Sequence, residues 1–205
     1  MLKKSVKGDL ALYIQQPGWM AYEKLIKLNI YKRAREPSST VALKTLTGSM
    51  ENNNDFLKEF KSLMKCTLNY NDMLAIYGIT QNTQTNEYLI VFQYANDGSL
   101  YKYLRKNFSA LTWETKLQIL KDISDKLDNI HSCAYIHADF HSGNILQDQR
   151  SYIADLGLSK KNDENDSEDN IYGVMPYVAP EVLLGHKFTK AADIYGLGVI
   201  MSEIS

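Results

Sequence analysis

The most constraining feature of this chain is a short polar loop between apolar residues, IHADFHSGNIL, at residues 136–146. Asp139 and Asn144 lie in this loop, and a short strand predicted over residues 152–154 leads directly to Asp155. Asn144 and Asp155 would therefore converge from the two arms of one hairpin. Their side-chain oxygens suit Mg²⁺, which keeps several of its waters and bridges substrate phosphates.

Asp139 would stand beside that cation with a different task. Transfer of a phosphoryl group needs positioning, neutralisation of charge and a group that accepts the proton of the attacking hydroxyl. Taken alone, each of these acidic side chains is better explained as a loop cap or a solvated charge. The assignment therefore depends on the ordered set of motifs.

The composition is that of an ordinary globular protein. The 205 residues, 44% of them hydrophobic, suffice for one domain with two lobes. The formal net charge is -1, with 23 basic and 24 acidic residues spread along the chain, which argues against a nucleic-acid-binding surface or a polybasic membrane anchor. The apolar run near the N-terminus is short and interrupted at Gln15, Gln16 and Pro17, so we expect neither a signal peptide nor a membrane span. We predict a soluble, cytoplasmic protein without nucleic-acid or membrane partners.

The chain changes character near Gln93. Upstream, short strand-like runs occur at residues 40–43, 74–79 and 88–92, with one helix predicted at residues 55–64. Downstream, helices dominate. We therefore predict an α+β fold with a small strand-rich lobe followed by a helical lobe, and clefts between lobes are preferred ligand sites.

The longest predicted helix runs from a Thr112 cap to about Ser132. Apolar side chains recur along it at steps of three and four residues, so we expect this face to lie in a packed core. The apolar face of this helix consists of Trp113, Leu117, Leu120, Ile123, Leu127 and Ile130.

The segment at residues 160–170 is acidic and polar, and it predicts a mobile loop.

Three motifs in order resemble the eukaryotic-type protein kinase superfamily, in its serine/threonine or tyrosine-kinase-like form. His137-Ala138-Asp139 with Asn144 is similar to the H-R-D-x-x-x-x-N catalytic loop. Asp155-Leu156-Gly157 is similar to D-F-G, and Tyr177–Glu181 is similar to the A-P-E segment that closes the activation loop. The resemblance implies a two-lobed kinase-like domain over residues 41–205, with its N-lobe to about residue 92 and its C-lobe from about residue 99.

The same resemblance implies roles for the residues of the catalytic loop. Asp139 is the expected catalytic base, and Asn144 and Asp155 are the expected Mg²⁺ ligands, which also contact ATP. Asp193, in AADIYGLG, looks like the helix residue that braces the catalytic loop.

The expected ATP site extends upstream. Val41-Ala42-Leu43-Lys44 resembles the V-A-I-K strand, whose lysine binds the α and β phosphates of ATP and pairs with a helix glutamate. Glu59 is the matching glutamate. The backbone from Gln93 to Ala95 would meet the adenine edge, and Phe92 would gate the adenine pocket.

The chain departs from the family pattern where a glycine-rich loop should precede Lys44. No glycine lies between Gly18 and Gly48, so residues 1–40 are a divergent segment in place of that loop. Glycines let a backbone fold tightly over phosphates. Two interpretations remain for the basic residues Lys32, Arg33 and Arg35: substitute positive charge, or a solvated strand face.

Three further departures lie in the C-terminal half. Ala138 replaces the arginine that pairs with a phosphorylated activation-loop residue in many kinases, so activation of that type is not expected. His141 takes the place of a lysine that neutralises the transferred phosphate; it would serve either as a weaker, pH-sensitive donor or as a residue that orders the loop. Val174 replaces a threonine, which removes one hydrogen bond to the catalytic loop.

The sequence also ends within a helix that we expect to begin near Asp193, so we expect a kinase-like chain that is incomplete at both ends. Glu181 would then lack the arginine that the family supplies from a later region, and an unpaired buried carboxylate is costly.

Three functions follow, in order of preference. The first is ATP-dependent transfer of the γ-phosphate to a Ser or Thr hydroxyl of a protein, with Mg²⁺ as the metal; Tyr177 favours this over tyrosine phosphorylation. The second is a pseudokinase that serves as a binding or scaffold module. The third is a small-molecule phosphotransferase, because His137-x-Asp139-x-His141 also looks like the catalytic loop of enzymes that act on aminoglycosides or choline.

Overall fold

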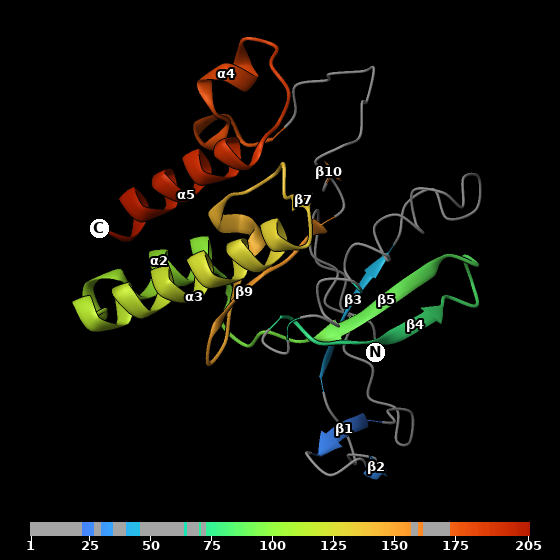
Figure 1. Cartoon of the computed structure of the whole chain (residues 1–205). Helices are drawn as coiled ribbons and strands as arrows, with labels where there is room; N and C mark the ends of the chain where they lie inside the picture. Colours follow the sequence, from blue (N-terminus) through green and yellow to red (C-terminus); the bar gives the residue numbers. More distant parts are fainter. Residues whose placement is uncertain are drawn as a thin grey trace. The chain divides into compact units, whose positions relative to one another are not determined.

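The computed structural model describes residues 22–26, 30–34, 40–45, 64, 70, 73–156, 160–161 and 173–205. Contacts divide the chain into two compact units. The first comprises Met1–Phe56 and Ala75–Tyr94, and the second comprises Leu57–Leu74 and Ala95–Ser205. Figure 1 labels the helices and strands of both.

The first unit is built on a three-stranded antiparallel sheet in the order β3-β5-β4. The strands are β3 (Val41–Thr45), β4 (Ile76–Gln81) and β5 (Tyr88–Gln93). Alternate residues of β3 are buried because successive side chains of a strand point to opposite faces. Val41 and Leu43 form the core with Leu89 of β5.

A second pair of strands in this unit is the antiparallel hairpin of β1 (Tyr22–Ile26) and β2 (Ile30–Ala34). Ile26 pairs with Ile30, so residues 27–29 connect the strands, and this connection contains no glycine.

The second unit contains a small sheet and the helices. The sheet has the order β6-β8-β9, formed by β6 (Gly98–Ser99), β8 (Ile145–Gln147) and β9 (Ser151–Ile153). A separate antiparallel pair consists of β7 (Tyr135–Ile136) and β10 (Lys160–Lys161).

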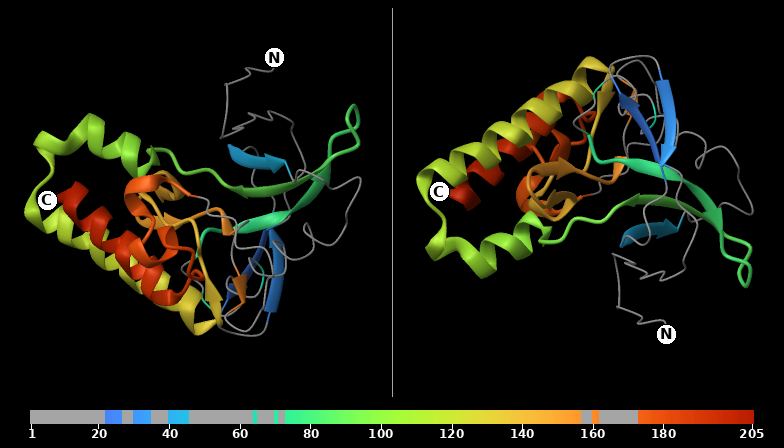
Figure 2. Two further views of the ribbon diagram at one scale, coloured as in Figure 1. Left: turned by 90° about the horizontal axis from the view of Figure 1, so that it is seen from above. Right: turned by 90° about the horizontal axis from the view of Figure 1, so that it is seen from below.

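The described residues of this unit form, among other elements, the helices α2 (Leu100–Asn107), α3 (Trp113–Ser132), α4 (Pro180–Leu183) and α5 (Lys190–Ile204). The long helices α3 and α5 pack against each other and lie side by side in both views of Figure 2. The described part of the unit also contains short turns of 3₁₀ helix, among them η1 (Phe108–Ala110), η2 (Ser142–Asn144) and η4 (Met175–Tyr177). Within the described residues, no helix has the length and apolar character needed to cross a membrane.

The bounds predicted for the long helix are confirmed, but part of its predicted core face is wrong. Thr112 caps α3 by accepting the backbone N–H of Thr115. Trp113 and Leu117 are 63% and 59% exposed. Residues two apart lie about 200° apart around a helix, so Leu117 faces away from the buried Ile119.

The buried face of α3 carries two lysines in place of these apolar residues. Lys116 lies with its ammonium 4.0 Å from the ring centre of Phe108, and Lys126 is only 1% exposed. Long lysine stems cover apolar surface well, which apolar periodicity alone does not anticipate. Ile123, Leu127 and Ile130 are buried as predicted.

The other predicted elements have mixed outcomes. The three strands of the first unit are confirmed, with small shifts of their ends. The last helix begins at Lys190, slightly before the predicted start near Asp193, because Thr189 caps it by accepting the N–H of Ala192. The predictions for the helix at 55–64 and the loop at 160–170 fall largely outside the described residues; of these ranges, Met64 is helical and residues 160–161 form β10.

Candidate active site

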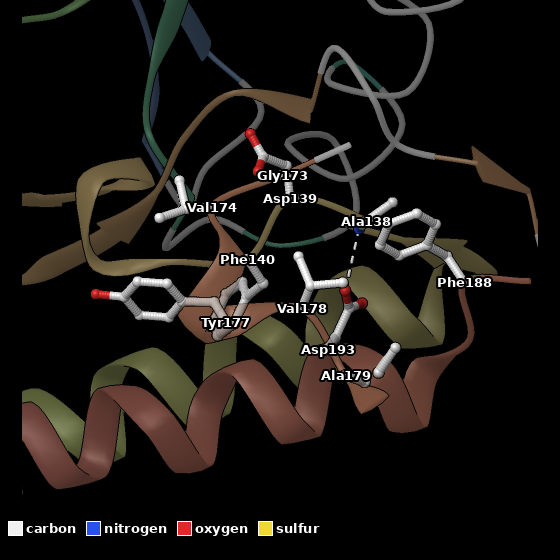
Figure 3. Close-up of a pocket in the computed structure, with 11 residues that line it drawn as sticks. Ala138, Asp139, Phe140, Gly173, Val174, Tyr177, Val178, Ala179, Phe188 and Asp193 are labelled. Carbon is white, nitrogen blue, oxygen red and sulfur yellow. Dashed lines mark hydrogen bonds between the residues drawn. The ribbon is translucent and has the colours of Figure 1, made fainter. Parts of the chain in front are cut away.

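The catalytic loop is anchored by one buried carboxylate on α5. Asp193, 2% exposed, accepts the backbone N–H of His137 at 2.9 Å and that of Ala138 at 3.0 Å. Its Oδ2 also lies 2.7 Å from Nε2 of His131, at the end of α3. These hydrogen bonds agree with the predicted role of Asp193 as the residue that braces the catalytic loop, and Figure 3 shows the bond to Ala138. The carboxylate thereby joins α3, α5 and the loop.

His137 links the loop to the strand that precedes Asp155. Its ring is fully buried, Nδ1 accepts the N–H of Asp139 at 3.3 Å, and Nε2 donates to the carbonyl of Ala154 at 3.0 Å. Burial lowers the pKa of His137 below its usual value, although Asp193 and the Ala154 carbonyl oppose this. The ring is therefore neutral, which is the form that these two bonds require.

Asp139 and Asn144 are brought together as the sequence predicts. The side-chain amide of Asn144 donates from Nδ2 to the carbonyl oxygen of Asp139 at 3.0 Å and to Oδ2 of its carboxylate at 3.1 Å. Burial alone would raise the pKa of Asp139, but the neighbouring His141 and the Asn144 amide outweigh it and hold the pKa below its ordinary value. Asp139 is thus ionised and able to accept a proton.

Asp155 follows the hairpin that the sequence predicts. Strands β8 and β9 pair with Ile145 opposite Ile153, and the N–H of Ala154 donates to the carbonyl of Asn144 at 2.8 Å. Asn144 and Asp155 therefore lie at the same end of this hairpin. Asp155 is exposed and adopts a φ of 61°. This left-handed conformation is uncommon for a residue with a side chain and is found disproportionately at functional sites.

The donor set at this hairpin end has the chemistry of a Mg²⁺ site. Asn144 turns its Nδ2 toward Asp139, so its amide oxygen faces away from that carboxylate. Mg²⁺ is commonly held by one or two carboxylates together with waters and substrate phosphates. Within the described part of the chain, no group of three or more His, Cys, Asp or Glu side chains is arranged to hold a metal.

The remaining predicted ATP-site residues lie elsewhere. Lys44 is in β3 opposite Ile90, and Gln93 ends β5, where its N–H donates to the carbonyl of Ala75 at 2.9 Å. Ala95 belongs to the second unit and is buried. Glu59 and Gly157 lie outside the described residues. The structure thus brings Asp139, Asn144 and Asp155 together in one unit and places Lys44 and Gln93 in the other.

Sequence reasoning missed a polar link between the catalytic loop and the end of the activation segment. The hydroxyl of Tyr177 donates to Oε1 of Glu203 and lies 2.8 Å from the hydroxyl of Ser142. Burial and the Glu203 carboxylate raise the pKa of Tyr177 to about 12. Tyr177 stood out in the sequence only as part of a motif. Its partners lie 35 and 26 residues away, and no local pattern identifies contacts at that range.

A pocket opens beside Asp139 (Figure 3). The catalytic loop forms one side of it through Ala138–Phe140, and the segment from Gly173 to Ala179 supplies most of the remainder. Val174, the residue that replaces a threonine, is 43% exposed at this pocket. A Cβ built on Gly173 would lie 3.5 Å from Oδ1 of Asp139, which is ordinary contact distance. A carboxylate at the edge of a pocket is suited to receive a proton from a hydroxyl that lies beside it.

The comparisons with known proteins all point to one protein family. Residues 18–205 match the family model described as protein tyrosine and serine/threonine kinase. A probable receptor-like protein kinase of Arabidopsis thaliana is 31% identical over 85% of this chain and 22% of its own length. The calcium/calmodulin-regulated receptor-like kinase 1 of the same plant is 30% identical over 85% of this chain and 40% of its own.

A third relative, an LRR receptor-like serine/threonine-protein kinase of Arabidopsis thaliana, is 27% identical over 85% of this chain and 15% of its own length. The chain therefore spans between 15% and 40% of the length of these relatives.

Proposed function

The chain belongs to the protein tyrosine and serine/threonine kinase family, and from this premise we propose that it transfers the γ-phosphate of ATP to a Ser or Thr hydroxyl of a protein. Its small β-sheet unit and its helical unit are parts of the N-lobe and C-lobe of that family's α+β fold. The observation that carries the proposal is the fixed carboxylate of Asp139. Its loop is held by Asp193, and its side chain is held by Asn144.

In the proposed reaction, Asp139 accepts the proton of the attacking hydroxyl, which enters at the small pocket beside it. Asn144 and Asp155 would hold Mg²⁺, which would supply neutralisation of the charge on the phosphates. A catalytic base must first lie within reach of the proton that it accepts, and it must then be in its unprotonated form. The lowered pKa of Asp139 supports that state throughout the physiological range.

The proposed ATP site adds Lys44 for the α and β phosphates, Glu59 as its ion-pair partner, and the backbone of Gln93 and Ala95 for the adenine edge. In this family such a lysine and glutamate must both be in place for transfer. These residues, and the domain limits of 1–40 and 41–205, remain predictions from the sequence motifs.

Tyr177 and the name of one relative support Ser/Thr as the acceptor. The relative in question is a receptor-like serine/threonine-protein kinase, and the match covers 85% of this chain. Cytoplasmic placement, a protein substrate and the lack of a nucleic-acid partner likewise stay predictions.

One sequence feature favours the pseudokinase alternative. No glycine lies between Gly18 and Gly48, so the segment before Lys44 lacks the residue type that folds most readily over phosphates. The two functions differ in one step, because a scaffold that keeps its nucleotide site binds ATP but does not transfer phosphate.

The test is calorimetric binding of ATP to the purified chain with and without Mg²⁺, followed by transfer to dephosphorylated casein. We expect Mg²⁺-dependent binding that Lys44→Ala and Asp155→Ala weaken at least tenfold, the scale of losing one charge-assisted contact. The matched controls are Lys121→Ala and Asp128→Ala, both exposed on α3, and they should bind as the unaltered chain does. Absence of binding would refute the enzyme, and binding without transfer would establish the scaffold.

A further inference from the structure

His141 makes contacts on three sides although its side chain is 16% exposed. Its Nδ1 accepts the backbone N–H of Gly143 at 3.0 Å, and its ring lies 5.7 Å from the ring of Tyr177, centre to centre. On the third side, Nε2 lies 3.6 Å from Oδ2 of Asp139. That last distance is too long for a hydrogen bond, but such contacts at catalytic groups often shorten when substrate binds.

The first contact fixes which nitrogen carries the proton. Because Nδ1 accepts a hydrogen bond from Gly143, the neutral ring must carry its proton on Nε2, the nitrogen that faces Asp139. The ring also lies tightly against Gly143, where an added Cβ would come within 2.6 Å of its Cε1 atom. The absence of a side chain at Gly143 therefore leaves the room in which the ring lies.

The two carboxylate oxygens of Asp139 have different surroundings. Oδ2 accepts from Nδ2 of Asn144 and faces Nε2 of His141. Oδ1 lies beside Gly173, at the pocket. The amide of Asn144 thus holds Oδ2, Nε2 of His141 faces the same oxygen, and Oδ1 is the oxygen at the pocket.

We propose that His141 is a positioning residue that, together with Asn144, holds Oδ2 of Asp139 so that Oδ1 accepts the proton of the substrate hydroxyl. This proposal rests on the proposed phosphotransfer function. It decides between the two roles considered for His141, because a ring packed against Tyr177 with Nε2 turned to Asp139 is placed to order the loop and not to contact the transferred phosphate. The effect should lie in the chemical step, since His141 would touch neither ATP nor the acceptor.

Two substitutions separate the two nitrogens of His141. His141→Gln places an amide N–H where Nε2–H stands, and so keeps the donor toward Asp139. His141→Asn places an amide oxygen where Nδ1 stands, and so keeps only the acceptor for Gly143. The matched control is His186→Asn, an exposed histidine between α4 and α5. The measured quantities are kcat and the KM values for ATP and for dephosphorylated casein.

We expect His141→Asn to lower kcat about tenfold, since small misplacements of a catalytic group carry losses of this order or more. His141→Gln should stay within about twofold of the unaltered chain, with both KM values unchanged in either variant. A kcat for His141→Asn equal to that of the unaltered chain would overturn the proposal. So would an equal loss in both variants, or a change confined to the KM for casein.

A second readout does not need activity. Nitrogen NMR of the isotopically labelled chain reports which ring nitrogen of His141 carries the proton. A proton on Nε2 supports the proposal, and a proton on Nδ1 overturns it. If the unaltered chain binds ATP but transfers no phosphate, the proposed function fails, and the position of this proton alone then supports or overturns the arrangement around Asp139.

Discussion

Ala138 shows how single residues of the catalytic loop depend on distant partners. Its φ is 65°, a left-handed conformation that costs a residue with a Cβ roughly 1 kcal/mol. The loop retains it because Asp193 accepts the N–H groups of both His137 and Ala138. The next residue is Asp139, so the direction of the catalytic side chain depends on a carboxylate 54 positions later in the sequence.

His137 should make the folded state sensitive to acid. Its pKa is lowered in the folded state, so below the unfolded value of about 6.5 the unfolded chain binds a proton that the folded chain does not. The free energy of unfolding should therefore fall as the pH drops below about 6.5, by up to about 1.4 kcal/mol per pH unit from this group. Urea unfolding followed between about pH 7 and pH 5 measures this slope.

The comparison variant for that measurement is His137→Gln, which keeps an N–H for the Ala154 carbonyl but does not titrate in this range. Its slope should be shallower than that of the unaltered chain, whereas the exposed His186→Gln should leave the slope unchanged. Equal slopes for all three chains would show that His137 is not held neutral.

At the scale of elements, the closest approach is that of α5 to the catalytic loop. A Cβ on Gly196 would lie 2.6 Å from the carbonyl oxygen of Phe140, so only glycine lets the helix lie directly on the loop. Gly198, one half-turn later, has no atom within 4 Å of such a Cβ. The packing of α5 therefore requires glycine at position 196 but leaves room for a side chain at position 198.

Substituting the two glycines in turn tests this packing. Gly198→Ala should raise the free energy of unfolding by roughly 0.5–1 kcal/mol, because alanine loses less conformational freedom in a helix. Gly196→Ala should lower it by about 1–3 kcal/mol, because backbone atoms have to move to admit the methyl group. Denaturant unfolding monitored by circular dichroism gives both values. A stabilising Gly196→Ala would show that the helix does not pack on the loop as described.

Tyr177 joins three elements, η2, η4 and α5, through its hydroxyl. Tyr177→Phe should lower the free energy of unfolding by about 1–3 kcal/mol, because the half-buried Glu203 carboxylate loses its donor. The raised pKa adds a second expectation. Stability from this group is fully present below the unfolded pKa of about 10 and is lost as the pH rises toward 12.

Unfolding should therefore be measured at about pH 8 and at about pH 11. Between these two pH values, the free energy of unfolding should fall less in Tyr177→Phe than in the unaltered chain. Tyr195→Phe, at an exposed tyrosine of α5, is the control and should behave as the unaltered chain does. An equal fall of the free energy of unfolding in Tyr177→Phe and in the unaltered chain would contradict the contact between Tyr177 and Glu203.

The helices also show what sequence could and could not predict. Capping residues gave the start of α3 at Thr112, because a cap is a local interaction. The burial of Lys126 and the exposure of Trp113 depend on what packs against the helix, so periodicity failed there. The cap at Thr189 is equally local, and it places the start of α5 slightly before the predicted start near Asp193.

At the scale of the whole molecule, motif order was sufficient to predict the family and the α+β fold, and the family match over residues 18–205 confirms both. The same motifs predicted Asp139 beside Asn144, since five residues in one loop restrict their separation. They could not predict the contacts of Tyr177 with Ser142 and Glu203, which exist only once the second unit has folded. The placement of Glu59 lies outside the described residues, so its pairing with Lys44 stays a prediction.

The most direct test of the account is the rate of phosphate transfer from Mg²⁺-ATP to dephosphorylated casein by the unaltered chain and by Asp139→Asn. The asparagine keeps the size of the side chain but cannot accept the proton. The account predicts a rate lower by two to four orders of magnitude, roughly the contribution of a general base, with unchanged affinity for ATP. Equal rates for the two chains would contradict it.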